Sequence, residues 1–192
     1  MADPLQILFG SPTRIKLLRL FLFNLGQSFS TAEAAARARV NKKEVRHELD
    51  LFYRAGLLKR SRRRGVLYFS LRSDFEYLRA LQGLLLNAPA RGADIVHRLR
   101  GAGNLRFVAL SGIFTGEWDG TLDLIVVGDR VSEGKFRSRI KRLEAELGKE
   151  LRYALLNSQD FYYRLNMNDK LLRDVLDYNH RIVLDRIGTG LK

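Results

Sequence analysis

The chain has 192 residues, of which 46% are hydrophobic, and it carries a formal net charge of +13. This length is enough for one large or two small domains with buried cores. The sequence has no cysteine and no apolar run near the ~18 residues that span a bilayer, which excludes disulfides, thiolate metal sites and a membrane-spanning helix. The histidines are scattered, and the N-terminal stretch lacks the pattern of a secretory signal. We therefore expect a cytoplasmic protein with no metal and no cofactor.

The positive charge is concentrated in the N-terminal third of the chain. Residues 1–72 contain 15 basic and 5 acidic side chains, a net charge of +10, whereas residues 73–192 contain 19 and 16, a net charge of +3. A basic excess confined to one region is typical of proteins that bind a polyanion. The alternative is a solvated basic surface without a partner.

Two helices are predicted in the first forty residues. Ser11 is placed to cap the first helix, because Pro12 follows it in the first helical position. Ser30 is placed to cap a second, alanine-rich helix over residues 31–37. Small residues on this helix would allow another helix to cross it closely.

A third helix is predicted between Asn41 and Gly56. Asn41 and Glu44 have the spacing of a capping box, and Gly56 tolerates the left-handed conformation that ends a helix. One face is apolar and should point inward: Val45, Leu49 and Phe52. Other residues near its N-terminal end lie away from that face and should point outward: Asn41, Lys42, Lys43, Arg46 and His47.

A strand, a tight basic turn and a second strand follow this helix. The strands are expected over residues 57–61 and 66–71, joined by Arg62, Arg63 and Arg64 with Gly65. This pattern predicts a β-hairpin that places three arginines at its tip.

The stretch from Thr31 to Leu71 resembles the winged helix-turn-helix of bacterial and archaeal transcriptional regulators, and the resemblance covers about residues 8–72. It implies that the third helix enters the major groove of double-stranded DNA and that the hairpin, the "wing", meets phosphates or a minor groove. The residues expected to bind DNA are Asn41, Lys42, Lys43, Arg46, His47, Arg62, Arg63 and Arg64.

A helical connector is predicted over residues 73–103. Ser73-Asp74 is expected to start a helix that runs to Leu86, and Pro89 and Gly92 then break the chain before a second short helix. Apolar residues recur on one face of the first helix: Phe75, Leu78, Leu81 and Leu85. By the resemblance, this face would pair two subunits into a homodimer. The alternative is that it packs on its own domain, and both interpretations stay open.

The last part of the chain, residues 104–192, has the pattern of a small α/β unit. Strands are expected over residues 105–110, 121–127 and 151–156, with a helix over 132–147 and short helices after Ser158 and Asp169. A short extended segment is expected at residues 182–184.

The segment SGIFTGEWDGTLDLIVVG, residues 111–128, resembles the centre of the minimal nucleotidyltransferase fold, and the resemblance covers about residues 104–187. The family motif is Gly-Ser, a loop, Asp-x-Asp on the next strand and a third carboxylate on a later strand. Ser111-Gly112 stands in the Gly-Ser place in reversed order, and Asp123 matches the second Asp. Thr121 and Arg152-Tyr153 stand where the other two acids are expected.

Two-metal nucleotidyl transfer needs several fixed carboxylates, so this count predicts no catalytic or metal-binding residues. Glu117 and Asp119 in the loop are the only acids that could complete a site. Ser111, Gly112 and Asp123 are candidates for a vestigial nucleotide site, which would make a nucleotide a candidate ligand.

The predicted fold class is therefore a two-domain α+β or α/β protein. It joins an N-terminal winged helix-turn-helix (1–72), a helical connector (73–103) and a C-terminal nucleotidyltransferase-like mixed sheet with helices (104–192). The predicted function is a DNA-binding transcriptional regulator whose second domain serves dimerisation or ligand sensing. The alternative is an active nucleotidyltransferase acting on protein or nucleic acid, and a weaker one is an RNA- or protein-binding module.

Overall fold

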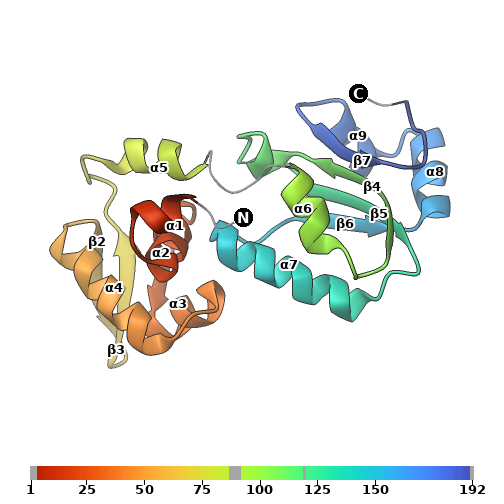
Figure 1. Ribbon diagram of the computed structural model, residues 1–192. Coiled ribbons are helices and arrows are strands. Elements are labelled where there is room, and N and C mark those ends of the chain that lie inside the picture. The colour runs from red at the N-terminus through yellow and green to blue at the C-terminus, as the bar shows by residue number, and fades with distance from the viewer. Residues whose placement is uncertain (1–3, 87–91, 119, 191–192) are drawn as a thin grey trace. The chain divides into compact units, whose positions relative to one another are not determined.

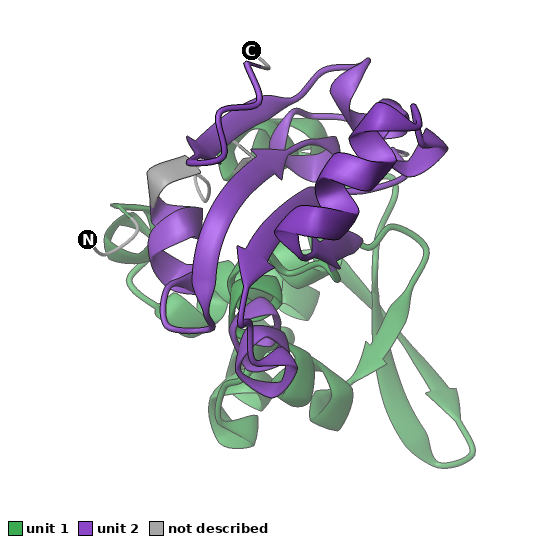
Figure 2. Cartoon of the chain, turned by 90° about the vertical axis from the view of Figure 1, so that its right-hand side faces the viewer, with its two compact units in different colours: residues 1–89, 142–150 green, residues 90–141, 151–192 purple. Residues whose placement is uncertain are grey.

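A computed structural model describes residues 4–86, 92–118 and 120–190 (Figure 1). The fold is mixed α+β with two small sheets. The chain groups into two compact units, which we call unit 1 (residues 1–89 and 142–150) and unit 2 (90–141 and 151–192) (Figure 2). The predicted connector is thus divided between the units, and a short segment near residue 146 joins unit 1.

Unit 1 combines helices with a three-stranded antiparallel sheet of order β1-β3-β2. Its elements are α1 (Pro4–Leu8), α2 (Pro12–Leu22), β1 (Ser28–Ser30), α3 (Thr31–Ala38), α4 (Lys42–Arg54), β2 (Leu58–Arg63), β3 (Val66–Leu71) and α5 (Leu78–Leu86). The strand β1 was not expected from the sequence, because three residues leave no measurable alternation.

Local side-chain bonds start the helices α2 and α3 as the sequence predicts. The Ser11 side chain accepts from the backbone N–H of Arg14, and Ser30 forms a capping box with Glu33. The bonds from the backbone and hydroxyl of Ser30 also hold the pKa of Glu33 below its usual value. Ala34 and Ala38 are buried, so α3 packs closely on α2 and α4.

The first part of the predicted connector differs from expectation. Arg72 binds Asp74 in a bidentate ion pair, and α5 begins only at Leu78, so Ser73-Asp74 does not start the helix. Leu85 is fully buried, and the side-chain amide of Gln82 donates to the backbone carbonyl of Leu22 in α2. Leu85 is therefore not available to the predicted dimer seam, whereas Phe75, Leu78 and Leu81 stay partly exposed and their pairing with a second subunit remains a prediction.

Unit 2 is built on a four-stranded mixed sheet of order β6-β5-β4-β7, in which only β5 and β6 are parallel. Its elements are α6 (Gly92–Leu99), β4 (Asn104–Leu110), the 3₁₀ turn η1 (Gly112–Phe114), β5 (Leu124–Asp129), α7 (Glu133–Leu147), β6 (Tyr153–Leu156), α8 (Ser158–Asn166), α9 (Lys170–Leu176) and β7 (Arg181–Asp185). The last turn of α7, from residue 142, is grouped with unit 1.

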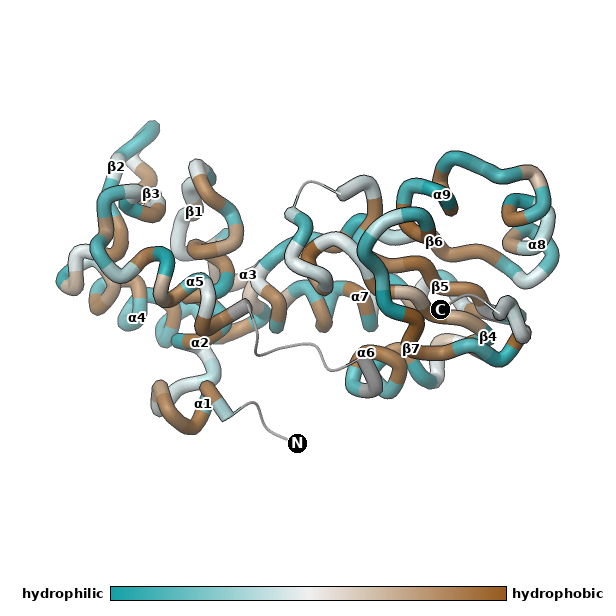
Figure 3. Tube along the Cα trace, turned by 90° about the horizontal axis from the view of Figure 1, so that it is seen from above, coloured by the Kyte–Doolittle hydropathy of each residue, from teal (hydrophilic) through white to brown (hydrophobic). Residues whose placement is uncertain are grey.

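Helices cover both faces of this sheet. Phe107 of β4 and Ile125 of β5 pack with Phe161 of α8 and Val175 of α9 in one apolar cluster. On the opposite face, Tyr153 meets Phe136 of α7 with ring centroids 5.5 Å apart. The central strands are therefore apolar on both faces, whereas β2 is mostly polar, and Figure 3 shows this contrast as brown β4 and β5 against teal β2.

The end of α7 is anchored within unit 1 by two polar side chains of the α2 region. The buried Arg19 donates to the carbonyl of Glu146 at 3.2 Å, and Asn24 donates to the carbonyl of Gly148 at 2.6 Å. Gly148 has φ +73°, and an added Cβ would lie 2.5 Å from the Leu20 nitrogen, so only glycine fits. Both donors supply partners for carbonyls that a helix end leaves unsatisfied.

Some expectations fall outside the described residues: Pro89, Asp119 and the outer ends of the predicted domains at residues 1–3 and 191–192. Within the described ranges, no helix combines the length and apolar character needed to cross a membrane.

The burial of Leu85 yields a stability prediction. Leu85→Ala should lower the free energy of unfolding by about 2–4 kcal/mol, because it leaves a cavity against α2. Leu84, its neighbour, is 48% exposed and gives the matched control. Leu84→Ala should change stability by less than about 0.5 kcal/mol in the same urea titration. Equal effects of the two substitutions would place the α5 contact face elsewhere.

Candidate functional site

The N-terminal end of α4 is capped by Asn41. Its side-chain oxygen accepts from the backbone N–H of Lys43 at 2.8 Å. Asn41 caps the helix as expected, but the predicted capping box is wrong in both halves, because the donor is Lys43 and not Glu44, and Glu44 does not reach back to Asn41. Instead, the Glu44 carboxylate accepts from the hydroxyl of Thr13 in α2 at 2.7 Å. Glu44 therefore makes a tertiary contact with α2 in place of the local capping contact.

The outward side of α4 carries unpaired cations. Val45, Leu49 and Phe52 are buried, and this fixes which side of the helix faces solvent. All five predicted residues at this end are exposed: Asn41, Lys42, Lys43, Arg46 and His47. Across the part of the chain that the structure describes, none of these side chains forms an ion pair.

The acids of α4, by contrast, are all engaged within unit 1. Glu48 is buried and accepts from Nε and Nη2 of Arg14 at 2.8 and 3.2 Å. Glu44 binds Thr13, as above, and Asp50 pairs with Arg60 of β2. Sequence reasoning missed these pairs, since no local spacing signals them. Glu48 and Asp50 are thus paired with arginines, whereas Glu44 is exposed and binds a neutral hydroxyl.

The hairpin β2–β3 places the three predicted arginines differently from a simple basic turn. Arg62 and Arg63 lie on β2, opposite Leu67 and Val66, and so point to opposite faces of the hairpin. The two-residue turn is Arg64-Gly65, with φ +48° and +79°. Both values belong to a type I′ turn, which favours Asn or Gly in its first position.

All three arginines are exposed, and the strands that carry them leave the sheet near the tip. Within the described chain β1 pairs only with residues 68–70 of β3, so residues 62–67 pair with each other alone. Figure 2 shows the hairpin as a two-stranded ribbon extending beyond the helices of its unit. Arg63 lies over the Tyr68 ring, with 5.4 Å from its guanidinium carbon to the ring centroid.

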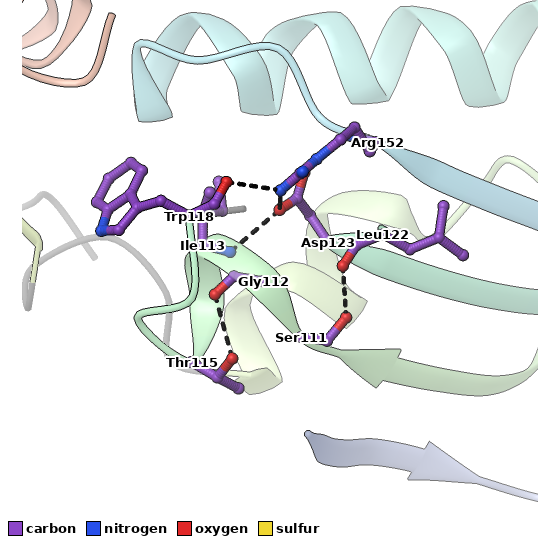
Figure 4. Close-up of polar contacts among 8 residues, drawn as sticks. All are labelled: Ser111, Gly112, Ile113, Thr115, Trp118, Leu122, Asp123 and Arg152. Atoms are coloured by element: carbon purple, nitrogen blue, oxygen red, sulfur yellow. Dashed lines mark hydrogen bonds and ion pairs between the residues drawn. The ribbon is translucent and has the colours of Figure 1, made fainter. Parts of the chain in front are cut away.

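In unit 2, Asp123 directly precedes β5 and is fully buried. Its carboxylate accepts four hydrogen bonds (Figure 4). Two come from the backbone N–H groups of Ile113 and Arg152, at 3.0 and 2.9 Å. The other two come from the Arg152 guanidinium, at 3.1 and 2.8 Å, and the same guanidinium donates to the carbonyl of Trp118.

The turn Ser111-Gly112 is shaped around this carboxylate. The Ser111 hydroxyl donates to the carbonyl of Leu122 at 2.8 Å, and its backbone N–H donates to the carbonyl of Asp123. Gly112 has φ +53°, and a Cβ there would collide with Oδ1 of Asp123. The three residues of the predicted vestigial nucleotide site are therefore brought together, but the Ser111 hydroxyl and the Asp123 carboxylate are already hydrogen-bonded to neighbouring protein groups.

This arrangement determines what the site can do chemically. A metal ion in a transferase site binds carboxylate oxygens, and here a guanidinium already holds both oxygens of Asp123. Thr121 is exposed and donates to Asp174 of α9 at 3.3 Å, a contact that the sequence did not indicate. Among the described residues, no group of three His, Cys, Asp or Glu side chains could hold a metal.

No protein-family model, no curated protein and no solved structure matches the chain.

The ion pair between the buried Asp123 and the partly exposed Arg152 predicts a large loss of stability when the carboxylate is removed. Asp123→Asn should lower the free energy of unfolding by about 3 kcal/mol, because Arg152 and two backbone amides lose a charged acceptor. Arg173 and Asp177 form an exposed ion pair at 3.1 Å, and Asp177→Asn is the matched control. That control should cost less than about 1 kcal/mol. Similar losses in both variants during chemical unfolding would contradict a structural role for Asp123.

Proposed function

We propose that the chain is a transcriptional regulator that binds double-stranded DNA through unit 1. In this proposal α4 is the recognition helix of a winged helix-turn-helix and β2–β3 is the wing. One observation carries it: the exposed cations of α4 form no ion pairs within the described chain, whereas each acid of α4 is engaged. Exposed, uncompensated cations are what phosphate contacts require.

The order of elements in unit 1 supports the same proposal. A short helix α3, a tight turn and the longer α4 are followed directly by the hairpin. The residue that ends α3, Arg39, has φ +52° and turns the chain between the two helices. The outward cations lie in the first turns of α4, the part that meets base edges in helix-turn-helix proteins.

For unit 2 we propose a non-catalytic role in dimerisation or in binding a ligand. The sheet in which β4 and β5 are antiparallel and β5 and β6 parallel supports a nucleotidyltransferase-like fold. The saturated Asp123 supports the absence of nucleotidyl transfer. A homodimer remains the expected form, because one recognition helix reads a short site and a pair reads two half-sites.

Salt dependence tests DNA binding directly. If about five phosphates are contacted, the logarithm of affinity should fall with the logarithm of salt concentration with a slope of roughly −4 to −5 per monomer. Fluorescence anisotropy with a labelled mixed-sequence duplex measures this slope. Replacing Arg62, Arg63 and Arg64 together by Gln should reduce it by about 2–3.

The matched control removes three exposed cations of unit 2: Lys135, Arg137 and Lys141. Their replacement by Gln should leave the slope unchanged. If both triple variants reduce the salt slope equally, the chain has only a general basic surface. A salt slope near zero for the unaltered protein would contradict DNA binding.

A substitution at the turn residue Arg64 should change stability and DNA affinity in opposite directions. A left-handed arginine costs about 1–2 kcal/mol, so Arg64→Asn should raise the free energy of unfolding by about 1 kcal/mol. The same change should weaken DNA binding and reduce the salt slope by about 0.9, because it removes one cation. Urea unfolding and anisotropy measure the two effects. If the more stable variant binds DNA as tightly as before, Arg64 does not contact DNA.

A further inference from the structure

Arg60 of β2 differs from the other basic residues of the hairpin because it is held by α4. Its guanidinium forms an ion pair with Asp50, and its guanidinium carbon lies 3.8 Å from the ring centroid of Tyr53. It also lies 5.5 Å from the ring centroid of Phe69, the residue opposite it on β3. We call Arg60, Asp50 and Tyr53 the hairpin clamp.

The clamp combines two kinds of interaction that suit arginine and not lysine. The guanidinium is planar, so it can stack on an aromatic ring while its N–H groups bind a carboxylate. The side chains of Arg60 and Asp50 are 33% and 45% exposed, so the ion pair alone would contribute little. Stacking on Tyr53 already fixes the conformation of the Arg60 side chain. The ion pair with Asp50 therefore costs little further conformational entropy.

The hairpin needs such a contact because little else orients it. An isolated two-stranded ribbon is marginally stable in water, and β1 reaches only to Tyr68 of β3. Beyond Ser61, the partner of Tyr68, no third strand among the described residues supports the ribbon. Arg60 therefore stands one residue before the last position of β2 that the third strand supports.

Strand alternation then distinguishes the arginines. Arg62 is two residues from Arg60 and projects from the same face of β2, the face on which Arg60 meets α4. Arg63 projects from the other face, where it covers Tyr68. Arg62 is thus the strand arginine that shares a side with α4.

We propose that Arg60 is a positioning residue, whose clamp on Asp50 and Tyr53 orients the hairpin so that Arg62 contacts the same DNA duplex as the cations of α4. The DNA part of this proposal rests on the proposed function. Arg60 does not itself serve as a phosphate contact, because Asp50 neutralises it.

The first test needs no DNA. Hydrogen exchange of backbone amides in residues 61–68 should become about fivefold faster in Arg60→Gln, since the ribbon loses its contact with α4. Asp50→Asn should act in the same direction and provides a second variant. Arg63→Gln, which removes a cation from the opposite face, should have a smaller effect. Unchanged exchange in both Arg60→Gln and Asp50→Asn would overturn the clamp.

The second test is a double-mutant cycle on DNA affinity. Arg62→Gln should reduce the salt slope by about 0.9 in the unaltered protein and by much less in the Arg60→Gln protein, where the hairpin is no longer aligned. Arg46→Gln is the control, since α4 stays in place and its effect should be the same in both backgrounds within about twofold in affinity. A mere loss of stability would leave both cycles additive, so an additive Arg62 cycle would overturn the positioning role.

The two tests distinguish a failure of the clamp from a failure of the proposed function. If hydrogen exchange responds as expected but the unaltered protein binds no DNA, the clamp holds the hairpin and the proposed function is wrong. If DNA binding is salt-dependent but neither exchange nor the Arg62 cycle responds to Arg60→Gln, the proposed function stands and Arg60 does not position the hairpin.

Discussion

A buried carboxylate must be neutralised and fully hydrogen-bonded, and in unit 2 this requirement shapes the loop before β5. Asp123 meets it with four donors, two of them on Arg152. In the turn before the loop, position 112 must be glycine, because a side chain there would collide with the carboxylate. Within the loop, the carbonyl of Trp118 accepts from the same guanidinium. The acid that resembles a metal ligand in sequence is thus bound by an arginine in the structure.

The same rule separates charges in unit 1. The acids of α4 bind partners on α2 and β2, and two of them, Glu48 and Asp50, pair with arginines there and not with the cations on the outward side. Burial of Glu48 with Arg14 anchors α4 on α2, and this packing determines which side is exposed. The proposed DNA surface is thus a by-product of how the acids are satisfied.

The hairpin shows a different balance between stability and function. Its first turn position holds Arg64 in a conformation that glycine or asparagine would adopt at lower cost. Backbone strain of this kind often occurs at functional positions, and an exposed cation at the tip of the hairpin fits the proposed contact with DNA. Arg60, two steps from Arg62 along β2, is instead neutralised and packed on α4.

The sequence by itself determined the local features: the caps at Ser11 and Ser30, the left-handed Gly56, the existence of the hairpin and the shortage of carboxylates around Asp123. These depend on residues within a few positions of one another, which is the range that spacing rules describe.

Only the tertiary structure decided which partner each long-range charge finds. Glu44 binds Thr13 and does not form the expected capping box. Asp123 binds Arg152, which lies 29 residues further along the chain. The burial of Leu85 likewise depended on whether α2 would cover it. In each case the outcome depends on which surfaces meet when the chain folds, and no periodicity in the sequence encodes that.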